Sequence, residues 1–140
     1  MSAMRIGAWG LLVLVLLTGC GDRGEMDAAA LSQQAKALQS VAAEGALLAH
    51  DAASGKSTGV YSGEHSAELR GAAAQIAASL EAATTTPGLD PTRRRLAVLG
   101  TQVMSYLDRI RDAPRSEDRA VGQRLAVFAR RIQTLGRSLT

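Results

Sequence analysis

Apolar residues recur at steps of three and four along four stretches of the chain, and this spacing predicts four amphipathic helices. The first helix is expected over residues 27–54 and the second over residues 62–83, with Ser62 as the N-cap of the second. A glycine-rich connection over residues 55–61 separates them, and Gly55 is suited to end the first helix. The two apolar stripes consist of Leu31, Leu38, Val41, Gly45 and Leu48, and of Leu69, Ala73, Ile76, Leu80 and Ala83.

The third and fourth helices have clearer start and stop signals. Asp90 is expected to be the N-cap of the third helix, with Pro91 at its first position, and Pro114 ends it. The fourth helix is expected to begin at Ser116. Their stripes consist of Leu96, Leu99, Val103, Tyr106 and Ile110, and of Val121, Leu125, Phe128, Ile132, Leu135 and Leu139.

Four such helices with short connections favour an all-α fold, an antiparallel up-down four-helix bundle over residues 27–140. Alanine and leucine dominate the apolar residues, and aromatic residues are few, which disfavours a β-sheet. A three-helix bundle is the alternative if the first helix frays near its start.

The N-terminal segment has the pattern of a secretory signal. Arg5 provides a basic start, and residues 6–17 form an apolar run that is shorter than the roughly 20 residues of a spanning helix. The run closes on Leu17-Thr18-Gly19-Cys20, which contains the only cysteine of the chain.

These four residues resemble the lipobox of bacterial lipoproteins. The resemblance implies cleavage before Cys20, diacylglycerol on its sulfur and usually a third acyl chain on the new amine. The chain would then divide into a signal peptide (1–19), a lipidated cysteine with its tether (20–26) and the helical domain (27–140). The location would be the cell membrane or outer membrane, on the non-cytoplasmic side, and Gly21 favours the outer membrane. The alternative is a simple secretory signal or an uncleaved anchor with an incidental cysteine.

Charge is divided unevenly along the chain. Residues 21–90 contain nine acidic and four basic residues, whereas residues 91–140 contain eleven arginines and four acidic residues. The two halves can attract each other within the fold, or the arginines can meet an anionic surface.

The up-down topology would gather several arginines at the end of the bundle nearest the membrane. These are Arg93, Arg94 and Arg95 at the start of the third helix and Arg130, Arg131 and Arg137 near the end of the fourth. They are predicted to contact anionic headgroups or a partner, each contributing about 1 kcal/mol near such a surface. The alternative is neutralisation by the acidic residues expected at the same end, which are Asp22, Glu25, Asp27, Glu81 and Asp90.

A second candidate site is a metal centre at the opposite end. His50 ends the first helix, and His65 shares a helix face with Glu68 at the start of the second. Two imidazoles and a carboxylate would suit zinc or copper. The alternative is that both histidines simply lie at a polar bundle end.

Nucleotide and nucleic-acid binding are disfavoured. Residues 54–58 (Ser-Gly-Lys-Ser-Thr) look like the end of a phosphate-binding loop, but His50 stands where that pattern needs glycine, and a helix precedes it instead of a strand. The arginines also lack the interleaved aromatic residues of a nucleic-acid surface.

The first hairpin, from Glu44 to Leu69, resembles one found in small uncharacterised helical proteins of actinobacteria and their relatives. The matching residues are a Leu-Leu-Ala helix, a Gly-Lys-Ser-Thr loop, Tyr61, and His65 followed by Glu68-Leu69. The resemblance implies no activity. It implies that Tyr61 packs at the entry of the second helix and that His65 caps the first helix or the loop.

The sequence therefore predicts a membrane-anchored envelope lipoprotein that binds a partner, without enzymatic activity and without a cofactor. The partner would be another envelope protein, in addition to the membrane held through Cys20. The alternative is a metal-binding bundle that uses His50 and His65. A small enzyme is a third class, for which no residue set stands out.

Overall fold

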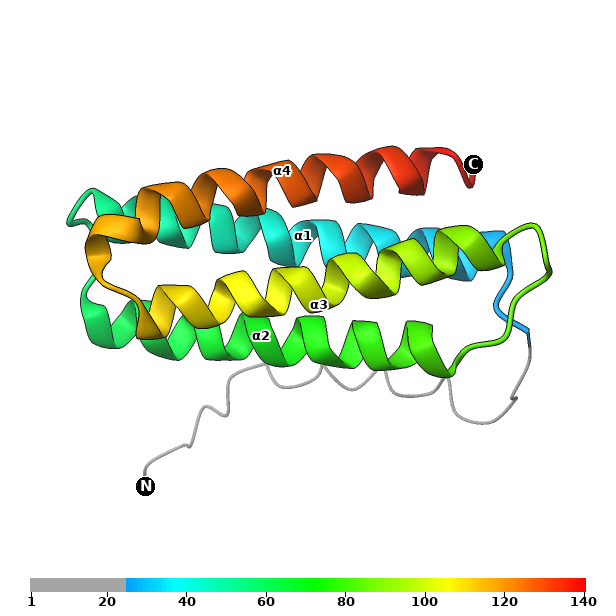
Figure 1. Cartoon of the computed structure of the whole chain (residues 1–140), viewed down its shortest axis with the longest axis horizontal. Coiled ribbons are helices and arrows are strands. Elements are labelled where there is room, and N and C mark those ends of the chain that lie inside the picture. Colours follow the sequence, from blue (N-terminus) through cyan, green and yellow to red (C-terminus); the bar gives the residue numbers. More distant parts are fainter. Residues whose placement is uncertain (1–24) are drawn as a thin grey trace, which may run out of the picture.

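The computed structural model of the protein describes residues 25–140, so the predicted signal peptide and Cys20 lie outside it. The described residues form an antiparallel four-helix bundle without β-strands, which confirms the predicted fold (Figure 1). The helices are α1 (Ala28–Ala53), α2 (Gly59–Ala82), α3 (Asp90–Asp112) and α4 (Asp118–Arg137), and a short 3₁₀ helix, η2 (Arg115–Glu117), precedes α4. Because α1 is 26 residues long, the three-helix alternative is wrong. None of the helices within residues 25–140 combines the length and apolarity needed to cross a bilayer.

The predicted stripes form the core, with two adjustments. All five stripe residues of α1 are buried, as are the stripe residues of α4 up to Ile132. Leu107 and Ala77, which the stripes omitted, are also buried, whereas Tyr106 and Ile76 are only partly buried. The buried faces of α2 and α3 are thus rotated slightly from the predicted stripes, because steps of three and four only approximate the helical period of 3.6 residues.

The predicted helix starts are wrong in detail. Thr58, not Ser62, is the N-cap of α2, and its hydroxyl accepts a hydrogen bond from the Tyr61 amide (3.2 Å). Ser62 is buried inside the helix and donates to the Thr58 carbonyl (2.9 Å). Asp90 lies within α3 and makes no capping bond, because its carboxylate binds arginines instead.

The bundle consists of two closely packed helix pairs, α1 with α4 and α2 with α3. Small residues permit the approach: a Cβ placed on Gly122 of α4 would lie 3.1 Å from the carbonyl oxygen of Ala46 in α1. Gly100 of α3 lies equally close to Ala77 of α2, with 3.1 Å between a Cβ placed there and that of Ala77. The α1–α2 and α3–α4 seams pack less extensively, which leaves room for surface grooves.

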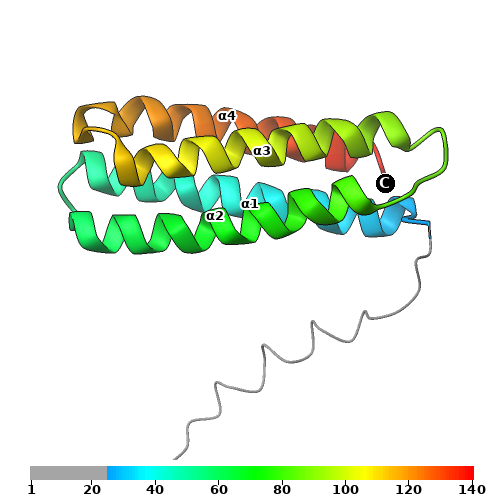
Figure 2. The same cartoon turned by 60° about the horizontal axis from the view of Figure 1, so that its bottom comes forward.

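The two ends of the bundle differ in what they bring together. At one end, called the tether end here, lie the start of α1, the end of α2, the start of α3 and the end of α4 (Figures 1 and 2). The amide of Met26 donates to the carbonyl of Thr84 there (2.7 Å), which fixes the incoming chain beside the α2–α3 connection. The opposite end, called the hairpin end, holds the α1–α2 and α3–α4 connections.

Candidate functional site

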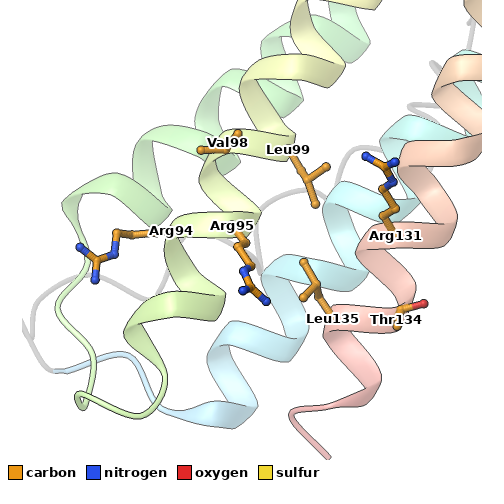
Figure 3. Close-up of a pocket in the computed structure, with 7 residues that line it drawn as sticks. All are labelled: Arg94, Arg95, Val98, Leu99, Arg131, Thr134 and Leu135. Carbon is orange, nitrogen blue, oxygen red and sulfur yellow. The ribbon is translucent and has the colours of Figure 1, made fainter.

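A groove opens between α3 and α4 at the tether end, and we call it the α3–α4 groove (Figure 3). It has a volume of about 540 Å³, and its wall is mostly apolar. The lining residues are Arg94, Arg95, Val98 and Leu99 from α3, and Arg131, Thr134 and Leu135 from α4. No acidic residue is among them.

The groove lies in the part of the α3–α4 seam that no large side chain fills. Tyr106 and Phe128 fill the seam further along, where their rings meet edge to face with centroids 5.4 Å apart. Toward the tether end no ring fills the space, and Val98 is left 57% exposed although it is apolar. Leu99 is buried beneath, so the floor of the groove is continuous with the core.

Two arginines of the groove are available for a ligand. Arg95 points toward Leu135 across the groove, and Arg131 stands on the opposite wall (Figure 3). Neither forms an ion pair with any residue in the range 25–140. Their aliphatic stems explain why the wall is mostly apolar despite the charges.

The other two members of the arginine triplet bind Asp90. Arg93 is 14% exposed and donates to Asp90 (2.6 Å) and to the carbonyl of Leu80 in α2 (2.7 Å), so it joins α3 to α2. Arg94 points away from the groove and pairs with the second oxygen of Asp90 (2.6 Å). The hydrogen bond from Arg93, helped by the charge of Arg94, holds the pKa of Asp90 below its ordinary value of 3.8. Asp90 is therefore the neutralising residue that the sequence suggested, but only for Arg93 and Arg94.

The remaining predicted arginines also lie toward the tether end. Arg130, Arg131 and Arg137 are exposed on the second half of α4, and Arg137 borders a second, smaller groove together with Ser32 and Lys36 of α1. None of the arginines of α4 forms an ion pair within the described part of the chain. Their contact with a membrane or partner stays a prediction.

At the other end of the molecule, His65 bridges α1 and α2. When protonated, it donates from Nε2 to Glu44 (2.8 Å) and from Nδ1 to Glu68 (3.2 Å). Partial burial by itself lowers the pKa of His65, but the hydrogen bonds and charges of Glu68 and Glu44 outweigh it, so the pKa lies above 6.5. The ring of Tyr61 stacks on His65, with centroids 5.7 Å apart.

The structure does not assemble the predicted metal site of His50, His65 and Glu68. His65 and Glu68 are together, but His50 borders a groove against α4 with Arg119 and Gln123. His50 lies six residues after Glu44, which is about 9 Å further along the helix axis. Within residues 25–140 no group of three His, Cys, Asp or Glu side chains is arranged to hold a metal ion.

The α1–α2 connection is a helix-capping loop. Gly55 takes a left-handed conformation (φ 70°), and the amide of Lys56 donates to the carbonyl of Asp51 (2.9 Å), which ends α1. His65 does not cap α1 or the loop, because both its nitrogens face carboxylates. Tyr61 lies in the first turn of α2, where its ring stacks on His65 but stays largely exposed instead of packing into the bundle.

Sequence reasoning placed Leu99 and Leu135 in the apolar stripes, but it missed Val98 and the α3–α4 groove, and it missed Glu44 as the partner of His65. The position of Val98 could have indicated an apolar surface site, because this apolar residue lies off the regular stripe of its helix. Nothing in the sequence indicated that Glu44 pairs with His65, since a contact between two helices of a hairpin depends on how each helix is rotated about its axis.

Comparisons with models of protein families, with curated proteins and with solved structures found no match.

Proposed function

We propose that the protein is a lipid-anchored envelope lipoprotein that acts by binding, and that the α3–α4 groove is its binding site. The proposal depends on one observation: the groove combines an apolar wall with two arginines, Arg95 and Arg131. Neither arginine has an ion-pair partner within residues 25–140. An apolar cleft with a few convergent polar groups is the usual form of a ligand site.

The position of the groove supports the anchored arrangement. Seven residues, Cys20 to Met26, precede the start of α1 and its cap Asp27. Fully extended, they span at most about 25 Å. A lipid on Cys20 would therefore keep the tether end, and with it the groove, close to the bilayer.

The charges favour an anionic ligand. The groove is bordered by arginines on both walls, and no carboxylate lines it. Arginine suits phosphate and carboxylate groups because its planar guanidinium donates two parallel hydrogen bonds. The ligand would thus combine an apolar part with a negative group.

The test is photo-crosslinking in intact cells from a probe at position 98, compared with a probe at position 61. We expect a reproducible adduct from position 98 that is lost when Cys20→Ser removes the anchor. The absence of any adduct from position 98 in the anchored chain would contradict the proposal, and so would an adduct unaffected by Cys20→Ser.

Exposed side chains at the hairpin end favour a second binding surface there. Val60 and Tyr61 lie in the first turn of α2 and are 73% and 57% exposed, which is unusual for adjacent large side chains of this kind. This end would point away from the membrane and suit another envelope protein. A protein adduct from position 61 that persists with Arg95→Gln would assign it as a separate docking surface.

A further inference from the structure

We infer that the α3–α4 groove binds one anionic phospholipid, with part of an acyl chain against Val98, Leu99 and Leu135 and the negatively charged headgroup at the rim that Arg95 and Arg131 border. The inference rests on the proposed function, because it takes the ligand from the membrane that holds the anchor. It adds the chemical class of the ligand and the role of each wall.

The apolar part of the ligand follows from the groove floor. Leu99 belongs to the core, Leu135 packs against it, and Val98 extends the same surface outward. An acyl chain laid along these side chains would remove their exposed apolar surface from water, which is worth roughly 25 cal/mol per Å². A small polar anion would leave this surface exposed.

The negative group follows from the rim. Arg95 belongs to α3 and Arg131 to α4, so each wall of the groove bears one guanidinium group, and the two groups extend toward opposite ends of the groove (Figure 3). Arg94 is held by Asp90 on the outer side and does not compete for the same position. A zwitterionic lipid also has a phosphate, but its ammonium group would bring a like charge to a rim that has no carboxylate.

The groove is too short for a docked helix, and it has room for only part of a lipid molecule. Its volume of about 540 Å³ lies within the range of roughly 300–1,000 Å³ typical of small-ligand sites. The lining residues of α3 span positions 94–99, about 7.5 Å along the axis. A helix that docks through anchors at i and i+7 needs about 10 Å, and the Tyr106–Phe128 pair fills the seam beyond.

The test uses an unlipidated chain of residues 20–140 with Cys20→Ser. Its buried core lies entirely between Leu31 and Ile132, so the chain retains the complete core without the leader. The only tryptophan of the sequence, Trp9, is in the leader, so Val98→Trp supplies a single fluorescent reporter at the groove. Val60→Trp at the hairpin end is the matched control, since Val60 is also an exposed valine.

Vesicles are made of phosphatidylcholine alone or mixed with an equal part of phosphatidylglycerol, with bromine atoms on the acyl chains as quenchers. We expect the Val98→Trp emission to be quenched by the anionic vesicles and not by phosphatidylcholine alone. The Val60→Trp emission should be unchanged in both. Absence of quenching at position 98, or equal quenching by both vesicle types, would overturn the inference.

Charge variants test the role of the rim. Arg95→Gln with Arg131→Gln should weaken binding to anionic vesicles by about thirtyfold, from about 1 kcal/mol for each arginine. Arg109→Gln with Arg124→Gln removes the same charge from the same two helices, at a smaller groove near the hairpin end. This control should have a much smaller effect. Equal weakening by both pairs would indicate attraction to the overall charge and overturn the inference.

The outcomes separate this inference from the proposed function. The vesicle assay contains no anchor, so its failure leaves anchoring and crosslinking untouched. A protein adduct from position 98 in cells, without quenching by vesicles, would assign the groove to a protein partner. It would overturn the lipid assignment while the proposed function stands.

Discussion

His65 is the residue at which the structure couples two helices through charge. Glu44 of α1 and Glu68 of α2 face its two ring nitrogens, and both can accept only if the imidazole carries two protons. The protonated form is therefore favoured in the folded state, and the pKa of His65 lies above 6.5.

We predict that the contribution of His65 to stability depends on pH. Because its folded pKa is raised, its contribution is complete below pH 6.5 and is lost as pH rises through the folded pKa. The difference in free energy of unfolding between the parent and His65→Gln should thus shrink from pH 6 to pH 8, measured by urea unfolding. His50→Gln is the control, since His50 is exposed and makes no ion pair within residues 25–140. A difference that stays constant for His65→Gln would contradict the account.

Arg93 and Arg94 are adjacent and bind the same carboxylate, but they differ in burial. Arg93 is 14% exposed and reaches the carbonyl of Leu80, whereas Arg94 is exposed on the surface. We predict that Arg93→Gln lowers the free energy of unfolding by about 1 kcal/mol or more, because the Leu80 carbonyl loses its charged donor. Arg94→Gln should change it by less than about 0.5 kcal/mol, as expected of an exposed ion pair. Equal losses in thermal or chemical unfolding would show that Arg93 has no special structural role.

At the scale of the elements, close approach of α1 and α4 depends on glycine. Gly122 lies against the backbone of α1, whereas a Cβ on Gly71 of α2 would meet nothing within 4 Å. Both glycines lie inside helices, so both gain helix propensity on substitution by alanine.

We predict that these two identical substitutions have opposite effects. Gly71→Ala should raise the free energy of unfolding by about 0.5–1 kcal/mol. Gly122→Ala gains the same propensity but forces α1 and α4 apart, and overpacking of this kind costs about 1–3 kcal/mol. Chemical unfolding of both variants measures the contrast. Stabilisation of similar size in both would mean that the α1–α4 contact is looser than described.

The helices themselves could be predicted because the apolar residues of each helix recur in the sequence at the spacing of a buried helix face. Leu31, Leu38 and Leu48 are buried as the periodicity requires. The helix boundaries were harder to predict, since Thr58 and Ser62 can both act as an N-cap. Only the backbone conformation of the connection decides between them.

The candidate site was only partly predictable. The up-down topology alone was enough to predict that the arginines lie at one end of the bundle, because the start of the third helix and the end of the fourth lie at the same end. The α3–α4 groove could not be foreseen, since its width depends on where small residues draw other helix pairs together and on the Tyr106–Phe128 contact. The partner of Arg93 was equally hidden, because the Leu80 carbonyl is a backbone group.

At the scale of the whole molecule, the two ends carry different chemistry. The tether end holds the α3–α4 groove with Arg95 and Arg131, and the hairpin end holds exposed Val60 and Tyr61 beside the His65 cluster. A lipid on Cys20 would direct the first end to the bilayer and the second away from it. The proposed function therefore depends on the state of this one cysteine.

The most direct measurement is the mass of the N-terminal peptide of the protein isolated from the membranes of the cells that produce it. The account predicts a chain that begins at Cys20 and carries diacylglycerol on the sulfur, with a further acyl chain on the amine or without it. Two acyl chains suffice for stable anchoring. A chain that retains residues 1–19, or one with a free thiol at Cys20, would contradict the anchor and the orientation of the bundle derived from it.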